Sequence, residues 1–261
     1  MKRTPITIDP QAFPAVFGPL LEGAAVYDSS CSQAARVYFI DREGGLYLKR
    51  AAKGSLRREA LLTGFFHEKG LGTRVLAYES LDCDWLLTER IRGEDCTHEA
   101  YMAEPKRLCD VTAQILRQLH EVDVAGCPVA DRTAEYLTQA RENFAAGHFD
   151  KALFPDNWGY ASAEEAWQVL EEGGSHLRAD TLLHGDYCLP NIMLRDWQFS
   201  GLIDLDSGGV GDRHVDLFWG TWSLQFNLKT DAYRERFLDA YGREKVQPEL
   251  LRVVAAAEVF L

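Results

Sequence analysis

The most informative stretch of this chain is His184-Gly185-Asp186-Tyr187-Cys188-Leu189-Pro190-Asn191. Short apolar runs flank it at 181–183 and 192–194, so it is expected to be a polar turn between two buried segments. An Asp with an Asn five residues later would occur by chance about 0.3 times in a chain of this composition, and the preceding His-Gly lowers this to on the order of 10⁻³. The pattern is specific, although an ordinary hydrogen-bonded turn with a buried His184 is the alternative interpretation.

A second acidic position follows this turn. Residues 199–205 have the apolar pattern of a strand, and Asp204 lies near its end. An Asp that takes the proton of an acceptor hydroxyl, together with an Asn and a second Asp that hold Mg²⁺ on nucleotide phosphates, forms a phosphoryl-transfer centre. The sequence therefore predicts that Asp186 is the catalytic residue and that Asn191 and Asp204 are the metal ligands.

Composition limits the possible classes of protein. The chain has 261 residues, enough for one large domain or two lobes, with 46% hydrophobic and 26% charged residues. Its net charge of −12 argues against a nucleic-acid partner and suits a cationic substrate. The six cysteines show no Cys-x2-Cys spacing, which indicates reduced thiols in a cytoplasmic protein. We find no secretory signal and no run of about 20 apolar residues, so no membrane partner is expected.

The order of elements predicts an α+β protein. The first ninety residues are rich in strand patterns, with a hairpin of 35–41 and 46–49 joined at Gly44-Gly45 and further strands at 73–78 and 85–91. Between them, 55–69 has helical spacing, with Ser55 as its expected N-cap and Gly70 at its end. From residue 92 onward helices dominate, and we expect them at 105–122, 163–172, 215–225, 231–241 and 248–261.

Several of these motifs together resemble those of the aminoglycoside phosphotransferase family, and most of all its 3′-phosphotransferases. The matching segments are Tyr47-Leu48-Lys49, Arg58-Glu59, Leu86-Leu87-Thr88-Glu89, the 184–191 turn, Ile203-Asp204, residues 211–217 and Glu258-Val259-Phe260. His-Gly-Asp in place of the His-Arg-Asp of protein kinases, and the lack of Phe-Gly after Asp204, are both traits of this family. The resemblance implies a two-lobed protein-kinase-like fold, with an N-terminal nucleotide-binding lobe over 1–91, a hinge at about 88–93 and a C-terminal lobe over 92–261.

The resemblance also assigns nucleotide-binding roles. Lys49 would contact the α- and β-phosphates of ATP, with GTP as an alternative donor, and Glu59 would hold Lys49 by an ion pair. Tyr47 would lie against the adenine. The remaining contacts would come from the backbone at Glu89 and Ile91 and from the serine-rich turn containing Ser30 and Ser32, which precedes the strand at 35–41.

On the acceptor side, the resemblance implies a small cationic aminoglycoside, phosphorylated at a hydroxyl such as the 3′-hydroxyl of kanamycin- or neomycin-like compounds, with antibiotic resistance as the result. The substrate residues would be Asp156, Glu258, Phe260 and the C-terminal Leu261. The protein would act as a monomer or weak dimer.

Some positions depart from the family pattern. Gly159 and Phe226 stand where acidic contacts are expected, and Asp206-Ser207 replaces a Gly-Arg, which leaves Arg213 as a candidate to supply the missing guanidinium. These departures favour a kinase of another hydroxylated metabolite, such as an amino alcohol or sugar, as an alternative function. A nucleotide-binding module without catalysis is a further alternative, which the presence of the complete catalytic set disfavours.

Overall fold

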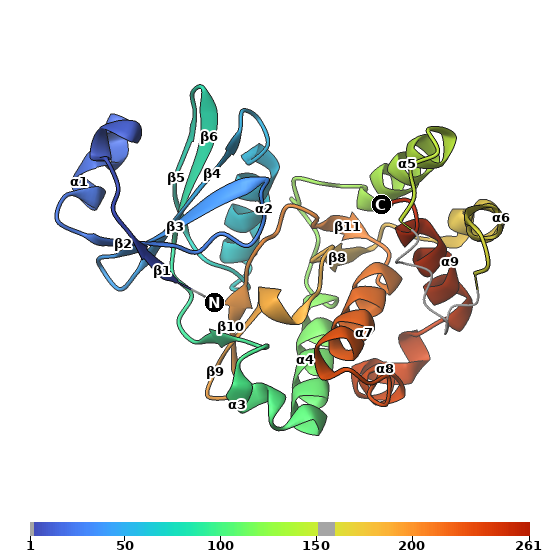
Figure 1. Cartoon of the computed structure of the whole chain (residues 1–261). Helices are drawn as coiled ribbons and strands as arrows, with labels where there is room; N and C mark the ends of the chain where they lie inside the picture. Colours follow the sequence, from blue (N-terminus) through green and yellow to red (C-terminus); the bar gives the residue numbers. More distant parts are fainter. Residues whose placement is uncertain (1–2, 151–159) are drawn as a thin grey trace. The chain divides into compact units, whose positions relative to one another are not determined.

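The computed structural model describes residues 3–150 and 160–261 (Figure 1). It divides into two compact units. The first comprises the chain up to Asp95 together with Met193–Asp206, and the second comprises Cys96–Ile192 together with Ser207–Leu261. The first unit is therefore discontinuous in sequence, because a segment that follows the 184–191 turn belongs to it.

A six-stranded antiparallel sheet in the order β1-β2-β3-β4-β6-β5 forms most of the first unit. Its strands and helices are β1 (Thr4–Ile6), α1 (Gly18–Leu21), β2 (Ala25–Asp28), β3 (Ala35–Asp41), β4 (Leu46–Ala52), α2 (Arg57–Glu68), β5 (Val75–Ser80) and β6 (Cys83–Glu89). β3 and β4 pair as a hairpin around Gly44-Gly45, as predicted. Both glycines have positive φ, 91° and 106°, which a residue without a Cβ adopts without strain.

The alternation of side chains along β4 separates two faces of this sheet. Leu46 and Leu48 are buried in an apolar core that also includes residues of α1. Tyr47 and Lys49 must then point to the opposite face, which α2 covers (Figure 1). The strand therefore places a lysine, rather than an apolar residue, between the sheet and its main helix.

The start of α2 differs from the expectation that Ser55 caps it. The helix begins at Arg57, and the hydroxyl of Ser55 donates to the carbonyl oxygen of Ala52. The buried carboxylate of Asp84 on β6 instead accepts the N–H of Leu56 at 3.0 Å. A tertiary contact thus satisfies a donor that a local cap would otherwise take.

A second, three-stranded sheet in the order β10-β9-β7 completes the first unit. Its strands are β7 (Glu94–Asp95), β9 (Ile192–Arg195) and β10 (Gln198–Leu202). Gly93 has a φ of 114°, and a Cβ at this position would lie 2.1 Å from the carbonyl oxygen of Leu194. Only glycine fits this close approach of two segments that are far apart in the chain.

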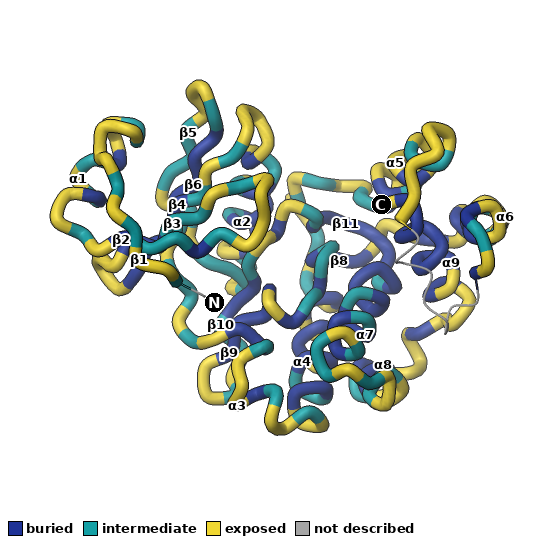
Figure 2. Tube along the Cα trace, viewed as in Figure 1, coloured by how far each residue is buried: buried dark blue, intermediate teal, exposed yellow. Residues whose placement is uncertain are grey.

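Helices dominate the second unit, as expected. They are α3 (Glu99–Met102), α4 (Pro105–Leu119), α5 (Arg132–Ala145), α6 (Ala163–Gly173), α7 (His214–Leu228), α8 (Arg234–Gly242) and α9 (Pro248–Glu258), with β8 (Thr181–Leu183) paired to β11 (Gly209–Gly211). α9 packs against α5, α6 and α7 and is buried along most of its length (Figure 2). On α4, Leu108, Ile115 and Leu119 are buried at the predicted spacing.

The α+β class is confirmed, and most elements lie within three residues of their expected bounds. β1, β2, β7, β11, α1, α3 and α5 were not predicted, and the strand expected over 199–205 ends at Leu202. No helix among the described residues is long and apolar enough to cross a membrane.

Candidate active site

In the first unit, Lys49 joins two carboxylates. Its ammonium lies 2.7 Å from Glu59 on α2 and 2.9 Å from Asp204, which follows β10. The ion pair between Lys49 and Glu59 that the sequence predicted is therefore present. The contact with Asp204 was not anticipated, and it brings a residue proposed to bind phosphates next to a residue proposed to bind metal.

Burial and charge act in opposite directions on this group of side chains. Burial lowers the pKa of Lys49, but the carboxylates of Glu59 and Asp204 together raise it above its ordinary value, so the ammonium stays charged. Burial raises the pKa of Glu59, and the Lys49 ammonium only partly offsets that rise. The side chain of Asp204 is 54% exposed, so it is the member of the group that is open to a ligand.

Asp204 has an unusual backbone conformation. Its φ is 60°, in the left-handed region that residues other than glycine rarely adopt. β10 ends at Leu202, two residues before this position. Backbone strain of this kind persists where surrounding structure imposes it, and it is found preferentially at functional positions.

In the second unit, residues 184–191, the catalytic loop, hold Asp186 and Asn191 together. The Asn191 amide nitrogen donates to the Asp186 carboxylate at 2.9 Å and to the Asp186 carbonyl oxygen at 3.0 Å. Asn191 is buried in a short 3₁₀ turn, Leu189–Asn191, whereas Asp186 is partly exposed. The amide nitrogen is thereby engaged with Asp186, and the Asn191 amide oxygen is the atom suited to a cation.

A buried aspartate fixes the start of this loop. The carboxylate of Asp216 accepts the backbone N–H groups of His184 and Gly185, each at 2.8 Å. The Nε2 of His120 lies 3.1 Å from the same carboxylate, and its Nδ1 lies 2.8 Å from the hydroxyl of Tyr241. Burial lowers the pKa of His120, so the neutral imidazole is favoured. Asp216 thus braces the start of the catalytic loop.

The guanidinium next to the catalytic loop comes from a residue that the sequence did not indicate. Gly185 has a φ of 83°, and a Cβ there would lie 1.9 Å from the carbonyl oxygen of Ser207. Arg132 on α5 donates to this same oxygen at 3.0 Å. Arg213, the candidate from the sequence, donates instead to the hydroxyls of Tyr241 and Thr181.

Tyr47, which is predicted to lie against the adenine, has an aromatic ring and a cation as neighbours in the first unit. The rings of Tyr47 and Phe39 are 5.2 Å apart, and the Arg3 guanidinium lies 3.6 Å from the Phe39 centroid. Arg3 also donates to the Tyr47 hydroxyl at 2.8 Å. The face that would receive the base is therefore aromatic. It also carries a cation, Arg3, which directly precedes β1.

The other predicted nucleotide contacts are backbone groups and a turn. The N–H of Glu89 donates to the carbonyl oxygen of Arg74, and the Glu89 carbonyl oxygen accepts the Thr73 hydroxyl at 2.5 Å. Ser30 accepts the N–H of Val37 at 2.9 Å and so closes the turn. Both Ser30 and Ser32 line a pocket of about 590 Å³ in the first unit. The side chain of Ile91 packs over Gly201.

The predicted acceptor residues differ in exposure. Glu258 is buried, and its Oε1 accepts the Tyr136 hydroxyl at 2.8 Å and the Trp219 indole N–H at 3.0 Å. Burial raises its pKa to about 7, although both hydrogen bonds lower it. Phe260 is buried against other aromatic rings, and Leu261 is 45% exposed. Asp156 and Gly159 lie outside the described residues.

Sequence reasoning missed Arg132, Tyr136 and Trp219. The first two lie on α5, where Thr133, Tyr136 and Ala140 are buried at helical spacing behind the N-cap Asp131. That signal was available and would have revealed the helix. No local signal indicates that Tyr136 and Trp219 both donate to a residue more than thirty positions away.

The oxygen atoms of Asn191 and Asp204 are suitable ligands for Mg²⁺. This ion takes carboxylate and amide oxygens and usually keeps several waters, so one or two protein ligands suffice for it beside nucleotide phosphates. When bound, the ion would neutralise charge on the phosphates.

Comparison with known proteins gives one consistent result. A model of the phosphotransferase enzyme family matches residues 30–253. A probable aminoglycoside 3′-phosphotransferase of Lactococcus lactis is 45% identical over 98% of this chain and 97% of its own length. An aminoglycoside 3′-phosphotransferase of Niallia circulans is 29% identical over 68% of this chain and 67% of its own. The crystal structure of an aminoglycoside 3′-phosphotransferase of type VIII, 26% identical, aligns with a TM-score of 0.75 over 96% of both chains. The protein-kinase-like fold and the resemblance inferred from the motifs are confirmed.

Proposed function

Since this chain belongs to the phosphotransferase enzyme family, we propose that it transfers the γ-phosphoryl group of ATP to the 3′-hydroxyl of kanamycin- or neomycin-like aminoglycosides. The observation that carries the acceptor class is the 45% identity, over almost the whole chain, to a probable aminoglycoside 3′-phosphotransferase. The net charge of −12 suits such a polycation.

Each unit supplies its own part of the chemistry. Lys49, held by Glu59, is suited to bind nucleotide phosphates because the two neighbouring carboxylates keep it charged. Asp186 takes the proton of the acceptor hydroxyl late in the transfer, since a loose transition state needs little activation of the nucleophile. Asn191 and Asp204 would hold Mg²⁺. Most of the rate enhancement then comes from positioning and electrostatic stabilisation.

The test uses purified protein with Mg·ATP, kanamycin and a 3′-deoxy analogue of kanamycin. We expect phosphorylation of kanamycin, none of the 3′-deoxy analogue, and loss of turnover in Asp186→Asn. Phosphorylation of the 3′-deoxy analogue at a similar rate would show that another hydroxyl is the acceptor. If no aminoglycoside of a panel is phosphorylated, with either ATP or GTP as donor, aminoglycosides are excluded as the acceptors.

A second candidate function is the phosphorylation of another hydroxylated metabolite, such as an amino alcohol or sugar. It is favoured by Phe226, which is 54% exposed where the family pattern expects an acidic contact. A screen of metabolites for ATP consumption tests it. Kanamycin resistance in a susceptible host that expresses this chain, abolished by Asp186→Asn, would count against it.

A further inference from the structure

Aromatic rings form a row along α7 beside the catalytic loop. Trp219, Trp222 and Phe226 follow at intervals of three and four residues, so they share one side of the helix. Trp222 and Phe226 stack with centroids 5.0 Å apart and planes 11° apart, and Trp219 meets Trp222 edge to face at 5.3 Å. The hydroxyl of Ser223, within this row, accepts the N–H of Leu189 at 2.9 Å. The row is therefore anchored to the catalytic loop.

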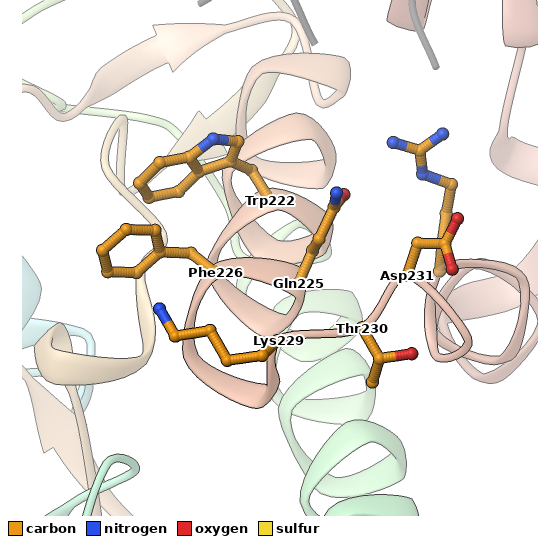
Figure 3. A pocket seen from close by; sticks show the side chains of 7 residues that line it. Trp222, Gln225, Phe226, Lys229, Thr230 and Asp231 are labelled. Carbon is orange, nitrogen blue, oxygen red and sulfur yellow. The ribbon is translucent and has the colours of Figure 1, made fainter. Parts of the chain in front are cut away.

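One end of the row borders a pocket of about 530 Å³ in the second unit (Figure 3). The ammonium of Lys229 lies 4.2 Å from the centroid of the Phe226 ring, and Figure 3 shows it directed at that ring. Lys229 ends the helix with a φ of 58°, a left-handed conformation that only a few per cent of residues other than glycine adopt. An aromatic face of this pocket thus binds a cation in the free protein.

The charges of the pocket determine how a second cation would bind. Lys229 and Arg234 are positive, and Asp231 is the one carboxylate among the described residues that line the pocket. An additional ammonium beside Lys229 would be repelled by it. A ligand ammonium can therefore reach this face of Phe226 only by displacing Lys229, which is exposed.

We propose that Trp222 and Phe226 form a subsite for an ammonium-bearing ring of the acceptor, and that Lys229 occupies this subsite until the acceptor displaces it. This inference rests on the proposed function. Aromatic faces attract ammonium groups through the ring quadrupole and also pack against the apolar face of a saccharide ring. The rings would replace the acidic contact that position 226 lacks.

The test measures steady-state kinetics with kanamycin in four variants. Phe226→Ala and Phe226→Leu each raise the KM for kanamycin about 3- to 30-fold, the range of cation–π strengths, with kcat within twofold and the KM for ATP unchanged. Leu keeps the apolar bulk, so it isolates the aromatic face. Lys229→Met lowers the KM for kanamycin. Lys69→Met is the matched control, because Lys69 lies 5.2 Å above the Phe65 ring in the first unit and should change neither constant.

The outcomes separate this inference from the proposed function. Kanamycin turnover with an unchanged KM in both Phe226 variants, or a raised KM in Lys229→Met, would overturn the subsite and leave the proposed function standing. The second result would indicate that Lys229 contributes to kanamycin binding and does not compete with it. If no aminoglycoside is turned over, the subsite is tested by titrating wild type and Trp222→Phe with kanamycin and following the fluorescence. Fluorescence quenching that disappears in Trp222→Phe supports the subsite, and identical titrations overturn it.

Discussion

Glu258 is expected to make the stability of the protein depend on pH near neutrality. Its side chain is buried, and burial raises its pKa to about 7 from an ordinary 4.5. The folded state therefore keeps a proton that the unfolded state has released, and the free energy of unfolding falls as pH rises between these two values. The full effect is about 3 kcal/mol, of which about 2.5 kcal/mol falls between pH 5 and pH 8.

The variant Glu258→Gln isolates this effect. Glutamine keeps an oxygen that can accept from both Tyr136 and Trp219, which donate to the same Oε1 in the wild type. Both proteins are unfolded by urea at pH 5 and at pH 8. The free energy of unfolding of the variant, minus that of wild type, should be about 2.5 kcal/mol larger at pH 8 than at pH 5. All other titrating groups cancel in this comparison.

The control is Glu249→Gln, because Glu249 is an exposed carboxylate in the first turn of the same helix. The free energy of unfolding of Glu249→Gln should stay within about 0.5 kcal/mol of that of wild type at both pH values. A flat difference for Glu258→Gln as well, or a larger stability of the wild type at pH 8, would refute the reasoning that Glu258 is protonated because it is buried.

Three further predictions concern other parts of the molecule. Lys49→Met leaves the buried Glu59 without its cation, so it should lower the free energy of unfolding by about 3 kcal/mol and raise the KM for ATP. Urea unfolding and steady-state kinetics measure these two effects, and an unchanged free energy of unfolding would contradict the role of this ion pair. Asp186→Asn should lower kcat by about 10²- to 10⁴-fold with little change in the KM values, and a variant with the kcat of the wild type would exclude Asp186 as proton acceptor. Gly93→Ala should lower the free energy of unfolding, measured in urea, by at least about 2 kcal/mol, because its Cβ would overlap a carbonyl oxygen. Gly54→Ala, where φ is positive but the space is open, should lower it by only about 1 kcal/mol, and equal losses in the two variants would exclude the overlap as the cause.

Local sequence signals predicted the parts of the site that depend on neighbouring residues. The ion pair of Lys49 with Glu59 was expected from the family resemblance of their motifs, because the local pattern taken alone fits an exposed lysine and an exposed glutamate. The motif that contains Asp186 and Asn191 was recognisable from the local sequence, but the hydrogen bond between their side chains was not predicted.

Contacts between distant segments were not predictable. The capping of α2 by Asp84, rather than by Ser55, depends on how a strand of the sheet lies against the helix. The Arg132 contact with Ser207 spans 75 positions, and only the folded second unit brings the two together. For Asp204, propensity favoured continuing the strand, and the contact with Lys49 together with the left-handed φ shows that tertiary structure overrides it.

The discontinuity of the first unit affects how the chain is made. Glu94 pairs with Leu194, one hundred positions later, and Asp204 follows that segment. Domains are usually completed in order as they leave the ribosome. Here, the amino-terminal unit must wait for more than three quarters of the chain before β9 and β10 join it. The six-stranded sheet can form early, because all its strands precede residue 90, whereas β7 has no strand to pair with through most of synthesis.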